Sequence, residues 1–298
     1  MLAAAVVVLT AAAPVGPYKL SPAAAESVVV AIQKDRDDTR AWLRDSLTSY
    51  LATIARVDFG HRTMLTVGRA PGNDVRLDGE GIAYHHLQVS VEGDHFNLKA
   101  LDAAARFRVG NQELRETTLG PGTIRLGRYA LRLSHQGFPA LIVFDPRSPH
   151  FAAYKGLTYY PPDLGLRYIV ALAPDPRPED VVILSTRGNQ RHARRVGWFD
   201  FSVGKTACRL EVTRLLEPGV GEDDLSVFFR DSTTGHETYP VGRYVDPRHL
   251  PDGRYLLDFN LAYNPACAVS DHYNCPIPTR ANTLKVAIRA GEMDSHYH

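Results

Sequence analysis

The chain has 298 residues, of which 44% are hydrophobic and 22% are charged, and its formal net charge is +1. This length accommodates about two domains, and the apolar share is sufficient for substantial cores. The near-neutral charge provides no global field that would attract nucleic acid or an anionic membrane, so we expect neither as a partner. The 20 Pro and 23 Gly residues predict many turns and therefore a mainly β fold.

The chain begins with an apolar segment, residues 2–13, which is interrupted only by Thr10. It is shorter than the roughly 20 residues that a membrane-spanning helix needs, and we predict no transmembrane segment elsewhere. The segment is typical of the apolar part of a secretory signal, and residues 23–25 are three alanines at which cleavage could occur. We therefore expect residues 1–25 to be signal-like and the protein to be exported to the periplasm, cell surface or exterior. The alternative is an unstructured or buried tail.

Residues 26–55 are predicted to form a helix, because apolar residues recur there at helical spacing with charged residues between them. The apolar positions are Val29, Ile32, Trp42, Leu43, Leu47 and Leu51. Residues 56–137 show a different pattern, in which apolar and polar residues alternate over short runs between turn signals such as Pro71-Gly72-Asn73-Asp74. A period of two is that of half-buried strands, so this segment is predicted to be a β domain.

The order of residues in this β segment resembles the forkhead-associated (FHA) phosphopeptide-binding domain. The resemblance rests on Gly68-Arg69, Asn73-Asp74-Val75-Arg76-Leu77, residues 82–86 and residues 119–126. It implies a β-sandwich. In that family the arginine after the glycine, a serine three residues before the histidine and a loop asparagine hold the phosphothreonine.

Only part of that phosphate-binding set is present here. Arg69 and His86 match, whereas Ala83 replaces the serine and Gly110-Asn111 reverses the usual Asn-Gly order. One arginine cannot hold a phosphate dianion in a fixed geometry by itself. We therefore expect the sandwich without phosphopeptide binding, and residual phosphate binding through Arg69 is a lesser hypothesis.

Residues 138–292 are predicted to form a second β-rich, barrel-like domain, followed by a tail at 293–298. A strand is expected at 138–144, and a β-hairpin is expected at 197–212 with its turn at Gly204-Lys205. Several unusual short motifs occur in this order: Phe229-Arg230-Asp231, Glu237-Thr238-Tyr239, Gly242-Arg243-Tyr244, Asp258-Phe259-Asn260, Asn264-Pro265-Ala266-Cys267 and Cys275-Pro276. Together they resemble a bacterial family known only as a domain of unknown function. The resemblance implies a β-rich fold and brings no assigned activity.

A candidate site follows from strand periodicity in this domain. If residues 255–263 form one strand, Asp258 and Asn260 share a face, and Arg230 on a neighbouring strand could pair with either of them. With Tyr263, these residues would line a ligand pocket. The same groups could instead form a structural network that fixes strand register, which the lack of an evident nucleophile or general base favours.

The chain has three cysteines, of which Cys267 and Cys275 close a short loop rich in Pro, Asn and Asp. This spacing favours a disulfide in an oxidising compartment. The alternative is a metal site that includes His272, but structural zinc usually has four protein ligands. We therefore expect no metal and no cofactor, and we predict that Cys208 is a buried thiol.

The leading functional hypothesis is a binding or scaffold protein of the cell envelope or exterior, whose partner is a small ligand or a protein. The alternative is a hydrolase-type enzyme that uses Arg230, Asp258, Asn260 and Tyr263. The sequence leaves open whether the protein is an enzyme.

Overall fold

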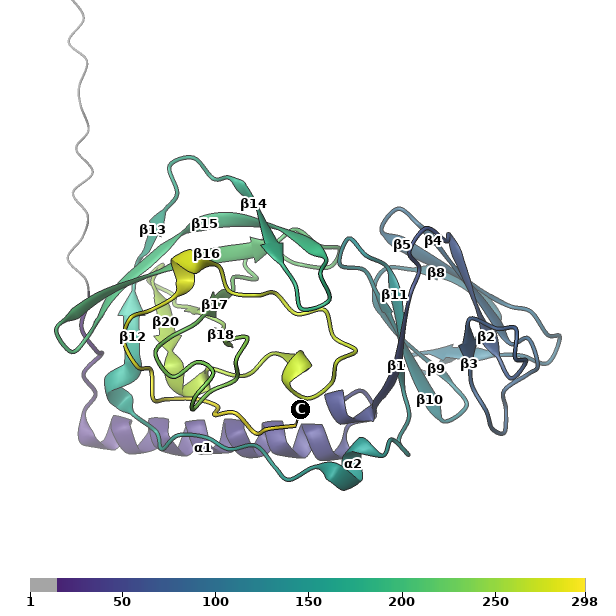
Figure 1. The fold of residues 1–298 in the computed structure, drawn as a ribbon, viewed down its shortest axis with the longest axis horizontal. Coiled ribbons are helices and arrows are strands. Elements are labelled where there is room, and N and C mark those ends of the chain that lie inside the picture. Colours follow the sequence, from purple (N-terminus) through teal and green to yellow (C-terminus); the bar gives the residue numbers. More distant parts are fainter. Residues whose placement is uncertain (1–14, 298) are drawn as a thin grey trace, which may run out of the picture.

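The computed structural model describes residues 15–297, and the signal-like residues 1–14 lie outside this range. The fold is mainly β, as predicted, and has three parts: an N-terminal helix, a β-sandwich and a second β-rich domain (Figure 1). The long helix runs along one side of the second domain, and the sandwich lies beyond its C-terminal end (Figure 1). No helix in the described part of the chain is long and apolar enough to cross a bilayer.

Helix α1 spans Pro22–Asp45. It begins at Ser21, whose Oγ accepts the backbone N–H of Ala24 at 3.3 Å. The three alanines expected as a cleavage site therefore lie in its first turn. The predicted helix is too long at its C-terminal end, because Ser46 starts a turn in which its hydroxyl accepts the N–H of Thr48 at 3.3 Å. A short 3-10 helix, η1 (Tyr50–Ala52), leads directly into strand β1.

The sandwich consists of two sheets of mostly antiparallel strands. The first contains, in spatial order, β1 (Thr53–Asp58), β11 (Ala140–Phe144), β10 (Tyr129–Ser134), β9 (Gly122–Leu126), β6 (Phe107–Val109) and β7 (Gln112–Leu114). The second contains β3 (Val75–Arg76), β2 (Met64–Gly68), β4 (Leu87–Glu92), β5 (His95–Ala100) and β8 (Glu116–Leu119). Fully buried residues from both sheets, including Leu65, Phe96 and Ile124, fill the space between them.

Strand β11 corrects the expected domain boundary. It was predicted to open the second domain, but it pairs with β1 on one side and β10 on the other, inside the sandwich. All five of its residues are buried, because Leu141 and Val143 face the sandwich core whereas Ile142 and Phe144 face the second domain. An uninterrupted apolar run is what a strand buried on both faces requires.

The second domain wraps several small sheets around one core. Its strands are β12 (Arg167–Val170), β13 (Leu172–Pro174), β14 (Asp180–Leu184), β15 (Gln190–Val203), β16 (Thr206–Leu215), β17 (Val227–Phe229), β18 (Arg243–Val245), β19 (Arg248–His249) and β20 (Tyr255–Asp258). Its short helices are α2 (His150–Ala153), η2 (Leu164–Leu166), η3 (Phe259–Leu261), η4 (Ala266–Ala268) and η5 (Arg280–Asn282). The sheets are β13-β15-β14 with β16 on β15, β12-β20-β19, and β17-β18.

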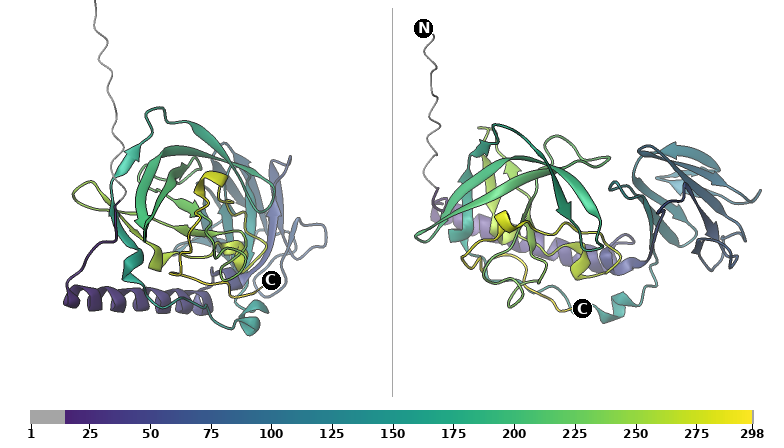
Figure 2. Two further views of the ribbon diagram at one scale, coloured as in Figure 1. Left: turned by 60° about the vertical axis from the view of Figure 1, so that its left-hand side comes forward. Right: turned by 45° about the horizontal axis from the view of Figure 1, so that its top comes forward.

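The predicted hairpin is confirmed as the pair β15–β16, in which Phe201 lies opposite Cys208 and Gly204 turns with a φ of 58°. Its long strands curve over the interior of the domain (Figure 2). Beneath them the core combines aliphatic and aromatic side chains, and Tyr168, Phe199 and Phe259 are fully buried in it. Cys208 is buried on β16, as predicted.

A third apolar cluster joins the two domains. Phe144 of the sandwich packs in it with Phe228, Tyr244 and Tyr273 of the second domain. The hydroxyls of Thr53 and Tyr273 also hydrogen-bond across the boundary at 2.9 Å. The two β domains therefore share a buried interface and form one body.

The C-terminal residues are bound to the second domain rather than forming the predicted tail. The backbone N–H of Met293 donates to the carbonyl of Thr158 at 2.8 Å. The hydroxyl of Tyr297 donates to the carbonyl of Gly156 at 2.6 Å. The end of the described chain thus lies against the segment that follows α2.

Candidate functional site

The predicted Arg230–Asp258 pairing is not formed, because the long strand expected at 255–263 ends early. Strand β20 stops at Asp258, whose Oδ1 accepts the N–H of Asn260 at 3.0 Å and caps η3. Strand β20 pairs with β12 and β19, whereas β17 pairs with β18. The two segments that were expected to be neighbours therefore belong to different sheets.

Two of the four candidate residues contact each other, since Asn260 Nδ2 donates to Asp258 Oδ1 at 2.9 Å, whereas Arg230 and Tyr263 have other partners. Arg167 Nε donates to Asp258 Oδ2 at 3.0 Å, and Arg230 Nε donates to a backbone carbonyl, that of Val241. The side chain of Asn260 holds both backbone groups of Asp163, at 2.7 and 2.8 Å. The hydroxyl of Tyr263 donates to Asp246 Oδ2 at 2.9 Å. Asp258 and Asn260 thus fix η2 against η3, and the four residues do not converge on one reaction centre.

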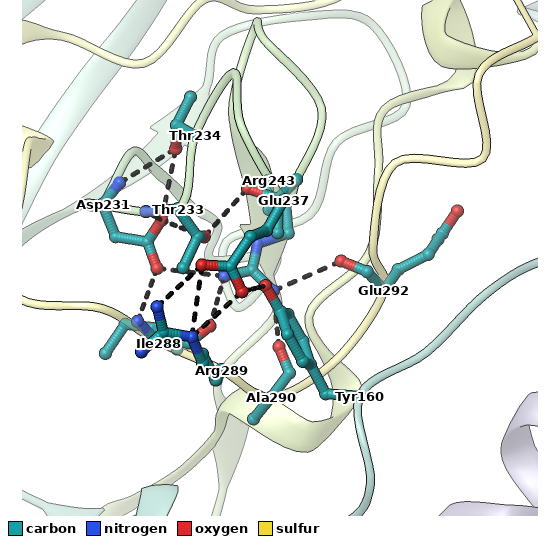
Figure 3. Close-up of polar contacts among 11 residues, drawn as sticks. Tyr160, Asp231, Thr233, Thr234, Glu237, Arg243, Ile288, Arg289, Ala290 and Glu292 are labelled. Carbon is teal, nitrogen blue, oxygen red and sulfur yellow. Dashed lines mark hydrogen bonds and ion pairs between the residues drawn. The ribbon is translucent and has the colours of Figure 1, made fainter.

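The polar centre of the domain is instead a buried ion pair between Arg243 and Asp231 (Figure 3). The side chains are 1% and 0% exposed, and Arg243 Nη2 lies 3.1 Å from Asp231 Oδ2. Arg243 also donates to the carbonyls of Ile288, Ala290 and Glu292, so it anchors the C-terminal segment. A buried charge pair is tolerated only when its remaining hydrogen-bonding groups are also satisfied, as they are here.

The other carboxylate contacts complete this network. Asp231 Oδ1 accepts the N–H and the hydroxyl of Thr233 at 3.0 and 2.6 Å, and Asp231 Oδ2 accepts the N–H of Ile288 at 2.7 Å. The register of β17 on β18 places Arg243 opposite Phe229, two residues before Asp231. Arg243 and Asp231 both belong to the short motifs of this domain. The sequence did not show which arginine pairs with which aspartate.

A cavity of about 460 Å³ lies between α1 and the second domain. Asp35 and Trp42 of α1 line it on one side, and Tyr263 and Glu292 of the second domain line it elsewhere. Of the sequence-predicted candidates, Asn260 and Tyr263 line this cavity, Asp258 lines a neighbouring one, and Arg230 lines neither. Sequence reasoning missed Glu292, because its burial depends on contacts between distant segments.

Glu292 is held tightly in the cavity wall. Its two carboxylate oxygens accept the side-chain and backbone N–H groups of Asn264 at 2.9 and 3.1 Å. Burial raises the pKa of Glu292 to about 7. Gly291 permits this approach, since it has a φ of 79° and a Cβ there would lie 2.5 Å from the carbonyl oxygen of Ala262.

The disulfide expected between Cys267 and Cys275 is not formed. The Sγ of Cys275 instead accepts the backbone N–H of Cys267 at 3.3 Å, and the two thiols are hydrogen-bonded neighbours. The hydrogen bond to Cys267, followed by burial, raises the pKa of Cys275 well above its ordinary value. Both cysteines lie in the cluster that joins the two domains. Among residues 15–297, no three His, Cys, Asp or Glu side chains gather to hold a metal ion.

The sandwich presents Arg69 on a rigid loop. Arg69 follows β2, it is exposed, and its backbone N–H donates to the carbonyl of Ala83 at 3.1 Å. The side chain of the buried Asn73 donates to the carbonyls of Ala70 and Tyr84, both at 3.0 Å. A Cβ on Gly68 would lie 2.5 Å from the carbonyl oxygen of Tyr84, so only glycine fits there.

His86 supports the same surface from inside the domain. It is 1% exposed; its Nδ1 accepts the N–H of Ala83 at 3.0 Å and its Nε2 contacts the carbonyl of Arg106 at 2.7 Å. Nδ1 therefore carries no proton and Nε2 donates, which makes the ring neutral. Ala83 offers no hydroxyl, and Asn111 lies at the exposed tip of the β6–β7 hairpin. Among the described residues, the Arg69 guanidinium makes no hydrogen bond or ion pair.

The sandwich with this loop geometry defines an FHA-like module, and the FHA domain profile matches residues 65–127. The second domain matches, over residues 152–293, the family described as Protein of unknown function (DUF1684). The chain therefore joins an FHA-like sandwich to a domain that matches the DUF1684 family, hereafter the DUF1684 domain.

Three solved structures are similar to parts of the chain. An uncharacterized protein of Haloarcula marismortui is 34% identical, with a match that covers 52% of this chain and 85% of that one at a TM-score of 0.41. The FhaA FHA domain, solved in complex with the intracellular domain of Rv3910, is 26% identical and covers 27% and 78%, with a TM-score of 0.21. A structure from an analysis of phosphothreonine-dependent FHA domain interactions is also 26% identical, covering 27% and 75%, with a TM-score of 0.21. A search of curated proteins found no match.

The Arg243–Asp231 pair predicts a large stability effect. We expect Arg243→Ala to lower the free energy of unfolding by about 3–5 kcal/mol, because it leaves a buried carboxylate unpaired. The matched control is Arg254→Ala, which breaks an ion pair whose members are 52% and 49% exposed and should change stability by less than about 1 kcal/mol. Urea denaturation measures both values, and equal effects of the two substitutions would contradict the structural role of Arg243.

The raised pKa of Glu292 predicts that the stability of the protein depends on pH. The carboxyl loses its proton near 4.5 in the unfolded chain and near 7 in the folded protein, so the folded state binds more protons between these values. The free energy of unfolding should therefore fall by on the order of 3 kcal/mol as the pH rises from about 4.5 to 7. Arg243 lowers this pKa and Asp294 raises it, and both contributions are smaller than that of burial.

The measurement compares Glu292→Gln with the unsubstituted protein by urea denaturation across this pH range. The variant cannot ionise at this position, so its stability curve should lack this fall. Parallel curves for the two proteins would show that Glu292 titrates normally.

Proposed function

We propose that this protein is a binding scaffold whose FHA domain recognises a phosphorylated segment of a partner protein through Arg69, Tyr84 and His85. The observation that carries this proposal is the exposed and uncommitted guanidinium of Arg69 on a loop held by buried side chains. An arginine with such freedom can form a bidentate, charge-assisted pair with a phosphate, and the exposed Tyr84 and His85 beside it supply the further donors that one arginine lacks. The matching FHA profile supports the same function.

The surroundings of Arg69 provide a second kind of contact. Tyr84 is 60% exposed, and its ring meets that of His85 edge-on at 5.4 Å. Exposed tyrosine and arginine side chains are among the residues that contribute most to protein interfaces. Because Ala83 supplies no hydroxyl to the phosphate, we expect an affinity that depends strongly on Arg69 and falls with added salt.

The test is binding of phosphothreonine peptides to the full-length protein, first on a peptide array and then by fluorescence anisotropy with the best peptide. Arg69→Ala should weaken binding at least about tenfold, the loss of roughly one charge-assisted contact. Arg76→Ala is the matched control, because Arg76 is a 58% exposed arginine on the neighbouring strand β3. Equal binding by the two variants, or equal binding of the unphosphorylated peptide, would refute the proposal.

Export is a separate part of the proposal and rests on the apolar residues 2–13. We expect the full chain, expressed in bacteria with a C-terminal tag, to fractionate outside the cytoplasm, and deletion of residues 2–13 to retain it inside. The mass of the exported chain locates any cleavage relative to Ser21, which caps α1. Recovery of the intact chain wholly with a cytoplasmic marker would refute export and leave the role of Arg69 untouched.

A further inference from the structure

The cavity between α1 and the DUF1684 domain has aromatic walls and acidic side chains. Four aromatic residues line it, namely Trp42, Tyr50, Tyr159 and Tyr263. Three carboxylates also line it: Asp35 from α1, Asp246 from the segment after β18, and Glu292 from the C-terminal segment. No Lys or Arg is among its lining residues in the described part of the chain. The volume of about 460 Å³ lies within the range of roughly 300–1,000 Å³ that small-molecule sites occupy.

Basic groups offset the acidic groups of the cavity only in part, because Arg36 and Lys34 act on Asp35 and Arg243 acts on Glu292, but none forms an ion pair with them in the described part of the chain. Burial is the main cause that raises the pKa of Asp35, of Asp246 and of Glu292. Two guanidinium groups of α1, those of Arg36 and Arg40, lie over the ring of Tyr159 at 4.8 and 4.9 Å from its centroid, so this ring already contacts cations of the protein itself. Arg40 is bound to the carbonyl of Leu157 and to Asp37.

The wall also contains an unsatisfied acceptor. Asn264 is 7% exposed, and its Nδ2 donates to Glu292 and to the carbonyl of Met293, while its Oδ1 is buried without a partner. A buried acceptor without a donor is costly, so a ligand that brings an N–H or O–H donor would relieve it. Carboxylates, an amide oxygen and the rings of Trp42, Tyr50 and Tyr263 therefore line the same cavity.

We propose that this cavity is a binding site for a small organic cation, either a protonated amine or a quaternary ammonium ion. Aromatic faces attract such a cation through their quadrupoles, and desolvated sites strengthen that attraction. The three carboxylates come from different elements and do not gather as metal ligands do, which favours an extended organic cation over a metal ion. This site is distinct from the Arg69 surface, so either proposal can fail without the other.

The test is isothermal titration of the full-length protein, in phosphate buffer that contains no amine, with two cations and their uncharged isosteres. Choline is compared with 3,3-dimethylbutan-1-ol, and benzylamine with benzyl alcohol. We expect at least one cation to bind with heat that saturates at millimolar concentration or below, and its isostere to bind at least about tenfold more weakly.

Variants then assign the site. Glu292→Gln and Asp246→Asn should each weaken binding of the cation severalfold, and Trp42→Ala, on the opposite wall, should do the same. The matched control is Glu222→Gln, the same substitution at an exposed loop position outside the cavity. Thermal denaturation of each variant identifies any that fail to fold, and the three cavity variants come from separate elements, so one folding failure leaves two tests.

Three results would overturn the proposal. Neither cation binding at millimolar concentration would exclude a site for cations of this size. Equal affinity for a cation and its isostere would show that charge is not recognised. Unchanged affinity in the folded cavity variants would place the cation elsewhere on the protein.

Discussion

The buried ion pair between Arg243 and Asp231 is the interaction on which the DUF1684 domain depends. Arg243 joins the β17–β18 pair to a C-terminal segment that lacks extended strands, by donating to three of its carbonyls. The other backbone hydrogen bonds of that segment go to scattered segments, such as those from Met293 to Thr158 and from Glu292 to Ala262, since a sheet does not take it up. A buried arginine with several donors can hold irregular backbone in one conformation, whereas an apolar side chain of the same size cannot.

This anchoring determines where the cavity-lining carboxylate lies. The carbonyl of Glu292 is bound by Arg243, and its side chain is bound by Asn264, so the carboxyl is fixed from both ends. The raised pKa of Glu292 is therefore a consequence of architecture. Helix α1 supplies the opposite wall of the cavity. The cavity remains open there because α1 packs against irregular segments of the second domain rather than against a flat sheet.

The two β domains are coupled through β11 and the cysteine loop. One face of β11 belongs to the sandwich core, and the other packs in a cluster that includes Cys267, Tyr273 and Cys275. The Arg69 surface lies at the end of β2, in the other sheet of the sandwich. The chain thus has its two candidate binding surfaces on separate elements of one body.

From the sequence alone, the mainly β fold, the FHA-like sandwich and the β15–β16 hairpin could be predicted, and the short motifs of the second domain could be recognised. These follow from local periodicity, turn residues and residue order, which are properties of short segments. Tertiary structure decided which charges meet. The alternation of residues 255–263 predicted one strand with Asp258 and Asn260 on the same face. This prediction was wrong because Asp258 caps η3 through a local hydrogen bond, and the strand ends there.

Partner choice among Arg167, Arg230 and Arg243 depended on strand order, and no period in the sequence encodes that order. Burial of Glu292 and of β11 likewise depended on segments far apart in the chain. Desolvation and charge pairing are long-range in sequence, since they depend on what surrounds a side chain in space. For that physical reason the fold class could be read from the residues, whereas the sites could be located only in the folded protein.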